Sequence, residues 1–274
     1  MNKDKILRGQ PFRNIIGKII DVKPTPHGHS STTFIIVGSS GKRYKLRYFR
    51  GLRKAIQIEK NVRKLPHVFP EFYGREERFL LFEWIDGDIV GKRMPPDDAY
   101  QIGKIVGEAH ELEEIDHVNY FRNFISIFYR DFQKLKEYAI FDEKILARIE
   151  LKFSKLRKKM KVDIALEVND IHGGNFMRDK KGRIYFIDEE GFSHRPKGEG
   201  LSKALNTLNF MKDGQNRAAF LKGYNEHHSD DYFDLDYQRL MAFLGMLKSI
   251  WVKHKIGIDY TNHKEAVLQM IKKI

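Results

Sequence analysis

Apolar and polar residues alternate along the first part of the chain, which is the pattern of strands with one buried face. Three such runs lie within residues 13–49, and the turn GSSG joins the last two as a hairpin. Residues 52–65 then carry apolar side chains at helical spacing, and this run stops at Pro66. Another apolar strand follows at 78–83 and leads into a polar turn. These elements predict a small antiparallel sheet with one helix.

From Pro95 onward the apolar spacing becomes helical. Amphipathic helices are expected at 96–113, at about 124–138 and 142–161, and within 201–274. The polar turn Asp86-Gly87-Asp88 is the predicted lobe boundary. It divides the chain into an N-terminal lobe, 1–86, and a C-terminal lobe, 87–274.

Composition narrows the class of protein. The chain has 274 residues, 41% of them apolar and 32% charged, as in a soluble globular protein. The absence of cysteine excludes disulfides and thiolate catalysis and agrees with a cytoplasmic location. No apolar run approaches the roughly 20 residues of a transmembrane helix, and the N-terminus lacks a secretory signal pattern. The net charge of +13 favours an acidic partner such as a nucleotide, nucleic acid or anionic lipid, although a generally lysine-rich composition explains it equally well.

The stretch 166–192 carries the candidate chemistry. Asp170 lies in a Gly-rich turn that ends at Asn175, and the strand RIYFI then leads directly into Asp188. Phosphoryl transfer uses such a set, because one carboxylate orients the attacking hydroxyl while an amide and a second carboxylate hold Mg²⁺. Asp and Asn also cap Gly-rich turns, but the ordered trio around an apolar strand favours the functional interpretation.

This segment resembles the catalytic and metal-binding segments of the aminoglycoside phosphotransferase and choline kinase superfamily, in which H-G-D-L-H-x-G-N precedes a strand and I-D-F/W. The resemblance implies an α+β, bilobal protein-kinase-like fold, with a small antiparallel β-sheet lobe and a larger, mainly helical lobe. It also implies that Mg²⁺-ATP donates its γ-phosphoryl group to a hydroxyl of a small molecule. Asp170 would be the catalytic base, and Asn175 and Asp188 would be metal ligands. Val168 and Asn169 depart from the usual His-Gly.

The strand at 42–49 offers a cation for the phosphates. Lys45 and Arg47 fall on one face of it. A kinase needs such a cation, paired with an acid from the next helix. In choline-kinase-like proteins the cation can be Arg, so Arg47 is preferred and Lys45 is the second choice. Glu59 is the expected partner, while an i,i+4 pair of Glu59 with Arg63 and a solvent-facing basic strand are the alternatives.

Two further segments complete the expected nucleotide site. Gly28, Ser30 and Ser31 lie in the loop between the first two strands, where a kinase-like fold covers the phosphates; an ordinary hairpin loop is the alternative. The main chain after the strand at 78–83 resembles the segment that holds adenine, although its tryptophan also suits a core position. The residues expected there are Glu83, Trp84 and Ile85.

Two other functions stay open at the level of sequence. The basic composition also suits a protein or lipid kinase on the same scaffold. The charge, together with Val168 and Asn169, suits a non-catalytic pseudokinase that binds nucleotide or RNA. Retention of all three polar positions of the catalytic segment argues against a protein that only binds. The primary prediction is therefore a cytoplasmic kinase that uses ATP and Mg²⁺ and acts on a small-molecule hydroxyl acceptor.

Overall fold

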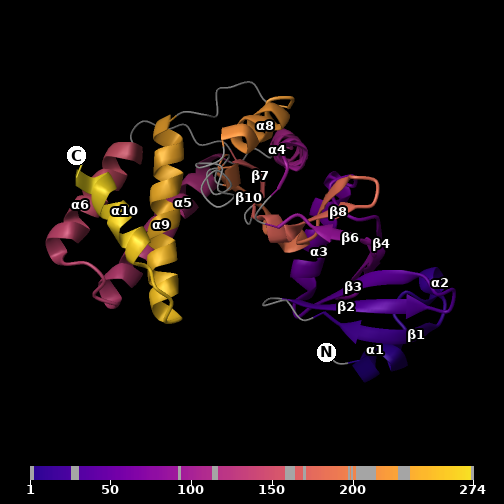
Figure 1. Cartoon of the computed structure of the whole chain (residues 1–274). Coiled ribbons are helices and arrows are strands. Elements are labelled where there is room, and N and C mark those ends of the chain that lie inside the picture. Colours follow the sequence, from indigo (N-terminus) through magenta and orange to yellow (C-terminus); the bar gives the residue numbers. More distant parts are fainter. Residues whose placement is uncertain are drawn as a thin grey trace. The chain divides into compact units, whose positions relative to one another are not determined.

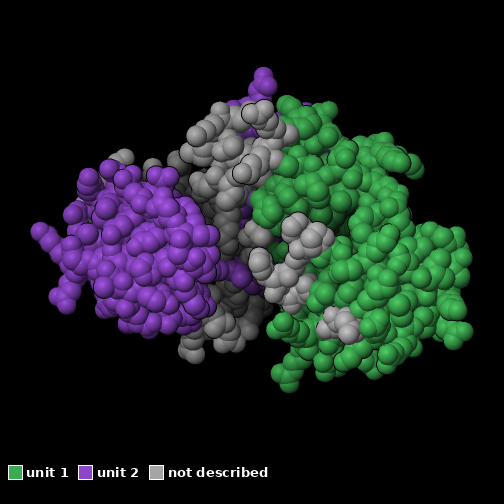
Figure 2. Space-filling model, turned by 60° about the horizontal axis from the view of Figure 1, so that its bottom comes forward, with its two compact units in different colours: residues 1–98, 172–192 green, residues 99–171, 193–274 purple. Residues whose placement is uncertain are grey.

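The computed structural model describes residues 3–25, 31–91, 94–112, 117–157, 164–168, 171–196, 198, 200–201, 214–227 and 235–272. Contacts divide the chain into two compact units, coloured separately in Figure 2. The first unit joins Met1–Asp98 with His172–Phe192, and the second joins Ala99–Ile171 with Ser193–Ile274. Each unit has its own cluster of buried apolar side chains.

The first unit contains a five-stranded antiparallel sheet in the order β1-β2-β3-β5-β4 (Figure 1). Its strands are β1 (Ile19–Pro24), β2 (Ser31–Gly38), β3 (Arg43–Phe49), β4 (Phe72–Glu76) and β5 (Phe79–Glu83). The helices of this unit are α1 (Lys3–Gly9), α2 (Arg13–Ile16) and α3 (Leu52–Lys64). The predicted antiparallel sheet and the helix after its third strand are both present.

The two faces of β3 differ as the alternation predicts. Tyr44 and Leu46 are buried in the core cluster that α1, α2, β1 and β2 also enter. Lys45 and Arg47 therefore lie on the opposite face, because successive side chains of a strand alternate. This register fixes where both cations can act.

Helix α3 packs through the apolar stripe read from the sequence. Ala55, Ile58 and Val62 are buried, and the helix ends just before Leu65 and Pro66. Asn61 on the same face is also buried, and its Nδ2 donates to the carbonyl of Phe192, 3.1 Å away. Helix α3 is thereby attached to the segment that follows the candidate metal ligand.

A second sheet explains why residues 172–192 belong to the first unit. Its strands, β6 (Gly87–Ile89), β8 (Phe176–Asp179) and β9 (Ile184–Phe186), have the order β6-β8-β9. The backbone N–H of Phe186 also donates to the carbonyl of Val68, at 2.9 Å. We expected one boundary at residue 86; the compact units instead divide after Asp98, because pairing of β6 with β8 ties the segment after residue 86 to the first unit.

The second unit is mainly helical. It contains most of α4 (Pro96–Glu111), then α5 (His117–Glu137), α6 (Glu143–Arg157), α8 (Gly214–Tyr224), α9 (Leu235–Lys255) and α10 (Thr261–Lys272). Helices α5, α6, α9 and α10 share one apolar core, in which the rings of Phe128 and Phe153 stack with centroids 3.7 Å apart. The short strands β7 (Ile164–Val168) and β10 (Phe192–Pro196) pair with each other.

The predicted fold class is confirmed: the protein is α+β, with a small antiparallel sheet and a larger, mainly helical part. In the described part of the chain, no helix combines the length and the apolar character needed to span a bilayer.

Candidate active site

Strand β3 and the segment after β9 form a cluster of ion pairs within the first unit. Lys45 Nζ lies 2.8 Å from Oε1 of Glu189, and Arg47 Nη1 bonds to the other oxygen of Glu189. Arg47 also contacts Glu190 at 2.9 Å and Asp188 at 3.3 Å. The structure thus brings together Lys45, Arg47 and Asp188, three residues that the sequence placed in one phosphate and metal site.

Backbone bonds hold Asp188 at this position. The strand β9 ends at Phe186, and the carbonyl of the next residue, Ile187, accepts a 2.6 Å bond from Lys45 Nζ. The N–H of Ile187 donates to the carbonyl of Asn175, at 2.9 Å. The segments that carry the two predicted metal ligands, Asn175 and Asp188, are therefore joined directly.

The acids in the cluster differ in burial. Glu189 is fully buried, whereas 32% of the Asp188 side chain is exposed. Burial raises the pKa of Asp188, and the charge of Arg47 opposes this increase only partly. Burial would also raise the pKa of Glu189, but Lys45 and Arg47 outweigh it and hold that pKa below its usual range. Of the three acids in the cluster, Asp188 therefore has the most exposed side chain.

The turn before β8 depends on glycine. The short helix η1 (Gly173–Asn175) starts after His172, whose Nδ1 accepts the N–H of Gly174 at 3.1 Å. A Cβ on Gly173 would lie 1.6 Å from the carbonyl oxygen of Gly91, so no larger residue fits without a backbone shift. The same close approach allows Gly91 N–H to donate to the carbonyl of Gly173, at 3.1 Å. These contacts fix the turn that presents Asn175.

Several predicted site residues lie outside the described part of the chain or only partly within it. Asp170, Gly28 and Ser30 are outside the described residues. Ser31 opens β2, but its side chain is not described. Their assigned roles stay predictions.

The expected pair of Arg47 with Glu59 is wrong. Oε1 of Glu59 accepts from Arg63 at 2.9 Å and Oε2 accepts from Arg75 at 2.5 Å. Arg47 instead binds the acids that follow β9, chiefly Glu189. The alternative i,i+4 pair between Glu59 and Arg63 is confirmed.

The predicted adenine segment begins at Glu83, the last residue of β5. The N–H of Glu83 donates to the carbonyl of Glu71 at 2.8 Å, so this N–H cannot also bind adenine. Ile85 is buried, and Trp84 Nε1 donates to Asp86 at 3.1 Å. The carbonyl of Glu83 and the main chain of Trp84 and Ile85 remain the groups that we assign to adenine as a prediction.

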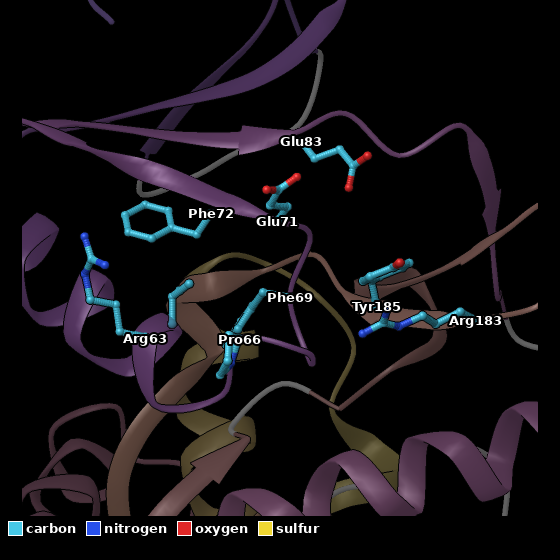
Figure 3. A pocket seen from close by; sticks show the side chains of 9 residues that line it. Arg63, Pro66, Phe69, Glu71, Phe72, Glu83, Arg183 and Tyr185 are labelled. Atoms are coloured by element: carbon cyan, nitrogen blue, oxygen red, sulfur yellow. The ribbon is translucent and has the colours of Figure 1, made fainter. Parts of the chain in front are cut away.

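A cavity of about 510 Å³ in the first unit has Glu83, from the predicted adenine segment, in its lining (Figure 3). The carboxylates of Glu71 and Glu83 face it beside the rings of Phe72 and Tyr185. The guanidinium of Arg183, also in the lining, is engaged by the carbonyl of His67 at 2.9 Å. Lys45, Arg47 and the acids after β9 are not among its lining residues.

The second unit contains a network of buried polar side chains that includes Glu167 on β7, the strand before Asp170 in the sequence. Glu167 on β7 accepts N–H bonds from Gly198 at 2.5 Å and from Gly200 at 2.6 Å, one on each oxygen. On α4, Nε2 of His110 lies 2.6 Å from Oε1 of Glu167, but the angle between them is not that of a hydrogen bond. The Nδ1 atom of His110 lies 2.9 Å from the hydroxyl of Tyr224. This network ties β7, α4, α8 and the chain after β10 together.

Comparison with solved structures supports the fold. An ethanolamine kinase from Plasmodium vivax superposes with a TM-score of 0.67 at 14% identity, covering 97% of this chain and 86% of that one. A choline kinase from Streptococcus pneumoniae gives 0.63 at 17% identity and covers 99% of both chains. The fold is that of the aminoglycoside and choline kinases. A spectinomycin phosphotransferase in complex with ADP and its antibiotic gives 0.62 at 17% identity, over 99% of this chain and 93% of that one.

By sequence alone, no protein-family model and no curated protein matches the chain. The similarity to these kinases therefore lies in the three-dimensional fold and not in overall sequence similarity.

Sequence reasoning missed the position of Glu189 in the cluster. The pattern of the family that the segment resembles has Phe or Trp directly after its second Asp, and this chain has Glu189 there instead. The available signal was this acid next to a buried strand, together with two cations on one face of β3. A buried acid needs a cationic partner, and Lys45 and Arg47 were available to provide it.

Proposed function

We propose that this protein is a phosphotransferase that transfers the γ-phosphoryl group of ATP to a hydroxyl group of a small molecule. The observation that carries the proposal is the ion cluster in which Arg47 and Lys45 on β3 lie beside the partly exposed Asp188. Cations and a metal-binding carboxylate placed together are the parts that phosphoryl transfer requires. The fold shared with small-molecule kinases supports the same function.

In the reaction, the acceptor oxygen forms a bond to the γ-phosphorus while the bond between that phosphorus and the bridging oxygen breaks, and ADP leaves. We assign acceptance of the hydroxyl proton to Asp170, the first acid of the motif. Arg47 and Lys45 would donate to phosphate oxygens and offset their negative charge. Most of the rate enhancement would come from this positioning and electrostatic stabilisation.

The side-chain chemistry of two predicted ligands, Asp188 in the cluster and Asn175 in the segment bonded to Ile187, fits Mg²⁺. Asp188 and Asn175 offer carboxylate and amide oxygens, the hard ligands that Mg²⁺ prefers. In the described part of the chain, only Arg47 bonds to the Asp188 carboxyl, and it uses Oδ1. The cluster holds two cations and three carboxylates, so a divalent ion would change its formal charge from −1 to +1. When bound, Mg²⁺ would shield the phosphate charge.

The test is an assay of ADP formation by purified protein with ATP, Mg²⁺ and a panel of acceptors that includes ethanolamine, choline and spectinomycin. The fold relatives motivate this panel. We expect one acceptor class to stimulate turnover, and Asp170→Asn and Asp188→Ala to reduce it to background. Full turnover in Asp188→Ala would refute the assignment. A cytoplasmic location, where ATP is available, is part of the same proposal.

Other partners remain alternatives to be tested. Phosphorylation of the protein itself or of a generic protein substrate would favour a protein kinase. Steeply salt-dependent RNA binding without phosphotransfer would favour a pseudokinase. No contact among the described residues favours a nucleic-acid or lipid partner over the small molecule.

A further inference from the structure

The anchor of the β3 cations does not come from α3. The residues that α3 buries include Ala55, Ile58 and Asn61, and none of these is acidic. Glu59, the acid of this helix, uses its two oxygens for Arg63 and Arg75. A different acid must hold Arg47.

Glu189 has the geometry of that anchor. Its side chain is fully buried, and each of its oxygens takes a different cation, Oε1 from Lys45 at 2.8 Å and Oε2 from Arg47. A carboxylate removed from water is stable only with such partners, so the burial of Glu189 and the placement of both cations depend on each other. Glu189 is therefore the acid that contacts both candidate phosphate ligands, while Arg47 has a further contact with Glu190 at 2.9 Å.

The same contacts involve the residues immediately before and after Asp188. Lys45 Nζ binds the carbonyl of Ile187, the residue before Asp188, at 2.6 Å, as well as the carboxylate of Glu189, the residue after it. Arg47 Nη1 is shared between Glu189 and Asp188, and its contact with Asp188 is the longer one, at 3.3 Å. While Glu189 holds this nitrogen, Asp188 keeps an oxygen available.

We infer that Glu189 is the positioning residue of the site: it holds Lys45 and Arg47 in the places where they meet phosphate and keeps Arg47 from closing on Asp188. It takes the part that an α3 acid was expected to fill. The inference rests on the proposed function, because it assigns Asp188 to Mg²⁺.

Glu189→Gln is the direct perturbation. An amide can accept from only one of the two cations and turns its NH₂ group toward the other. Asp188 then becomes a stronger partner for Arg47 and competes with Mg²⁺. Because changes of outer-shell partners typically cost 10- to 100-fold in metal affinity or activity, we expect the Mg²⁺ concentration for half-saturation to rise about 10-fold. We also expect kcat to fall about 10- to 100-fold while KM for ATP changes by less than about 3-fold.

The experiment measures the melting temperature of the purified 274-residue chain with ADP across a Mg²⁺ titration, beside kcat and KM. Far-UV circular dichroism verifies folding of each variant. Glu59→Gln tests the rival anchor and Glu137→Gln is the matched surface control; Glu137 contacts only Lys134 among the described residues. A raised Mg²⁺ requirement in Glu189→Gln but in neither control supports the inference.

The outcomes separate this inference from the proposed function. If wild-type protein responds to Mg²⁺ and ADP but Glu189→Gln titrates identically, the positioning role is refuted and the proposed function stands. If wild-type protein shows no response, both are refuted. If Glu59→Gln raised the Mg²⁺ requirement and Glu189→Gln did not, Glu59 on α3 would be the anchor of the cations.

A second variant covers the case in which Glu189→Gln does not fold. Lys45→Met combined with Glu189→Gln removes one cation with the acid, so the buried charges remain matched. If Glu189 acts through the cations, the double variant changes the Mg²⁺ concentration for half-saturation by less than the product of the two single-variant changes. Where Glu189→Gln alone does not fold, the change in the double variant should be no greater than that of Lys45→Met alone. A larger combined effect would overturn the inference.

Discussion

Replacement of Glu167 by Gln gives a prediction whose size can be derived from the second unit. The carboxyl of Glu167 is fully buried, and its two oxygens accept the N–H groups of Gly198 and Gly200. Glutamine has almost the same shape but only one oxygen. Whichever way its amide is turned, the oxygen accepts from one glycine N–H, and the NH₂ group faces the other, which loses its acceptor.

A buried donor without a partner costs about 1–3 kcal/mol, and a bond to a charged acceptor contributes about 1.5–3 kcal/mol. The loss of one accepted bond at Glu167 therefore predicts a decrease of about 2–3 kcal/mol in the free energy of unfolding. Substitution of the exposed Glu137, which pairs only with Lys134 in the described structure, should change it by less than about 0.5 kcal/mol.

The assay is urea unfolding followed by tryptophan fluorescence. The chain has two tryptophans, Trp84 in the first unit and Trp251 in the second. In a Trp84→Phe background the signal reports on the second unit alone, which avoids treating two units as one transition. A Glu167→Gln midpoint equal to that of the parent protein would show that the clamp on the two glycines does not stabilise this unit.

Further predictions concern packing and pH. Gly103→Ala should destabilise the second unit by more than about 2 kcal/mol in urea unfolding, because the new Cβ would lie 2.0 Å from the carbonyl oxygen of Phe220. Gly245→Ala in α9, with nothing within 4 Å of the new Cβ, should stabilise it by about 0.5–1 kcal/mol; equal effects of the two changes would contradict this. Phe153→Ala should cost about 3–5 kcal/mol in the same assay, since it removes a fully buried, stacked ring. Burial opposes it, but hydrogen bonds from Arg75 and Arg63 hold the pKa of Glu59 below its ordinary value of 4.5. The stability that wild type gains over Glu59→Gln should therefore be full above pH 4.5 and be lost as the pH falls through the folded-state pKa. A stability difference that does not change with pH would refute the pairing.

The sequence was sufficient to predict β2, β3, β5, β9 and the faces of β3, because these depend on local periodicity and spacing. It did not predict β4, β6, β7, β8 or β10, and the first apolar run holds the helix α2 before β1. Alternation placed Tyr44 and Leu46 in the core, and the strand before Asp188 followed from its apolar run. Such patterns are properties of neighbouring residues, so a single sequence reveals them.

The partner of Arg47 and the division into units could not be predicted in the same way. Both depend on contacts between residues far apart in the chain: Arg47 meets Glu189 across 142 positions, and β6 pairs with β8. As the acid among the many bases of the predicted helix, Glu59 was a plausible partner of Arg47, but α3 turns this acid toward Arg63 and Arg75. Tertiary packing decided both cases.

The most direct test of a phosphotransferase site at Asp188 is the melting temperature of wild-type and Asp188→Ala protein with ATP, measured with and without Mg²⁺. A ligand that binds only the folded state stabilises it by RT ln(1 + [L]/Kd), which is about 2.7 kcal/mol at one hundred times Kd. The account predicts an increase in wild type that depends on Mg²⁺ and is lost in Asp188→Ala. No increase at millimolar ATP, or the same increase in both proteins, would contradict it.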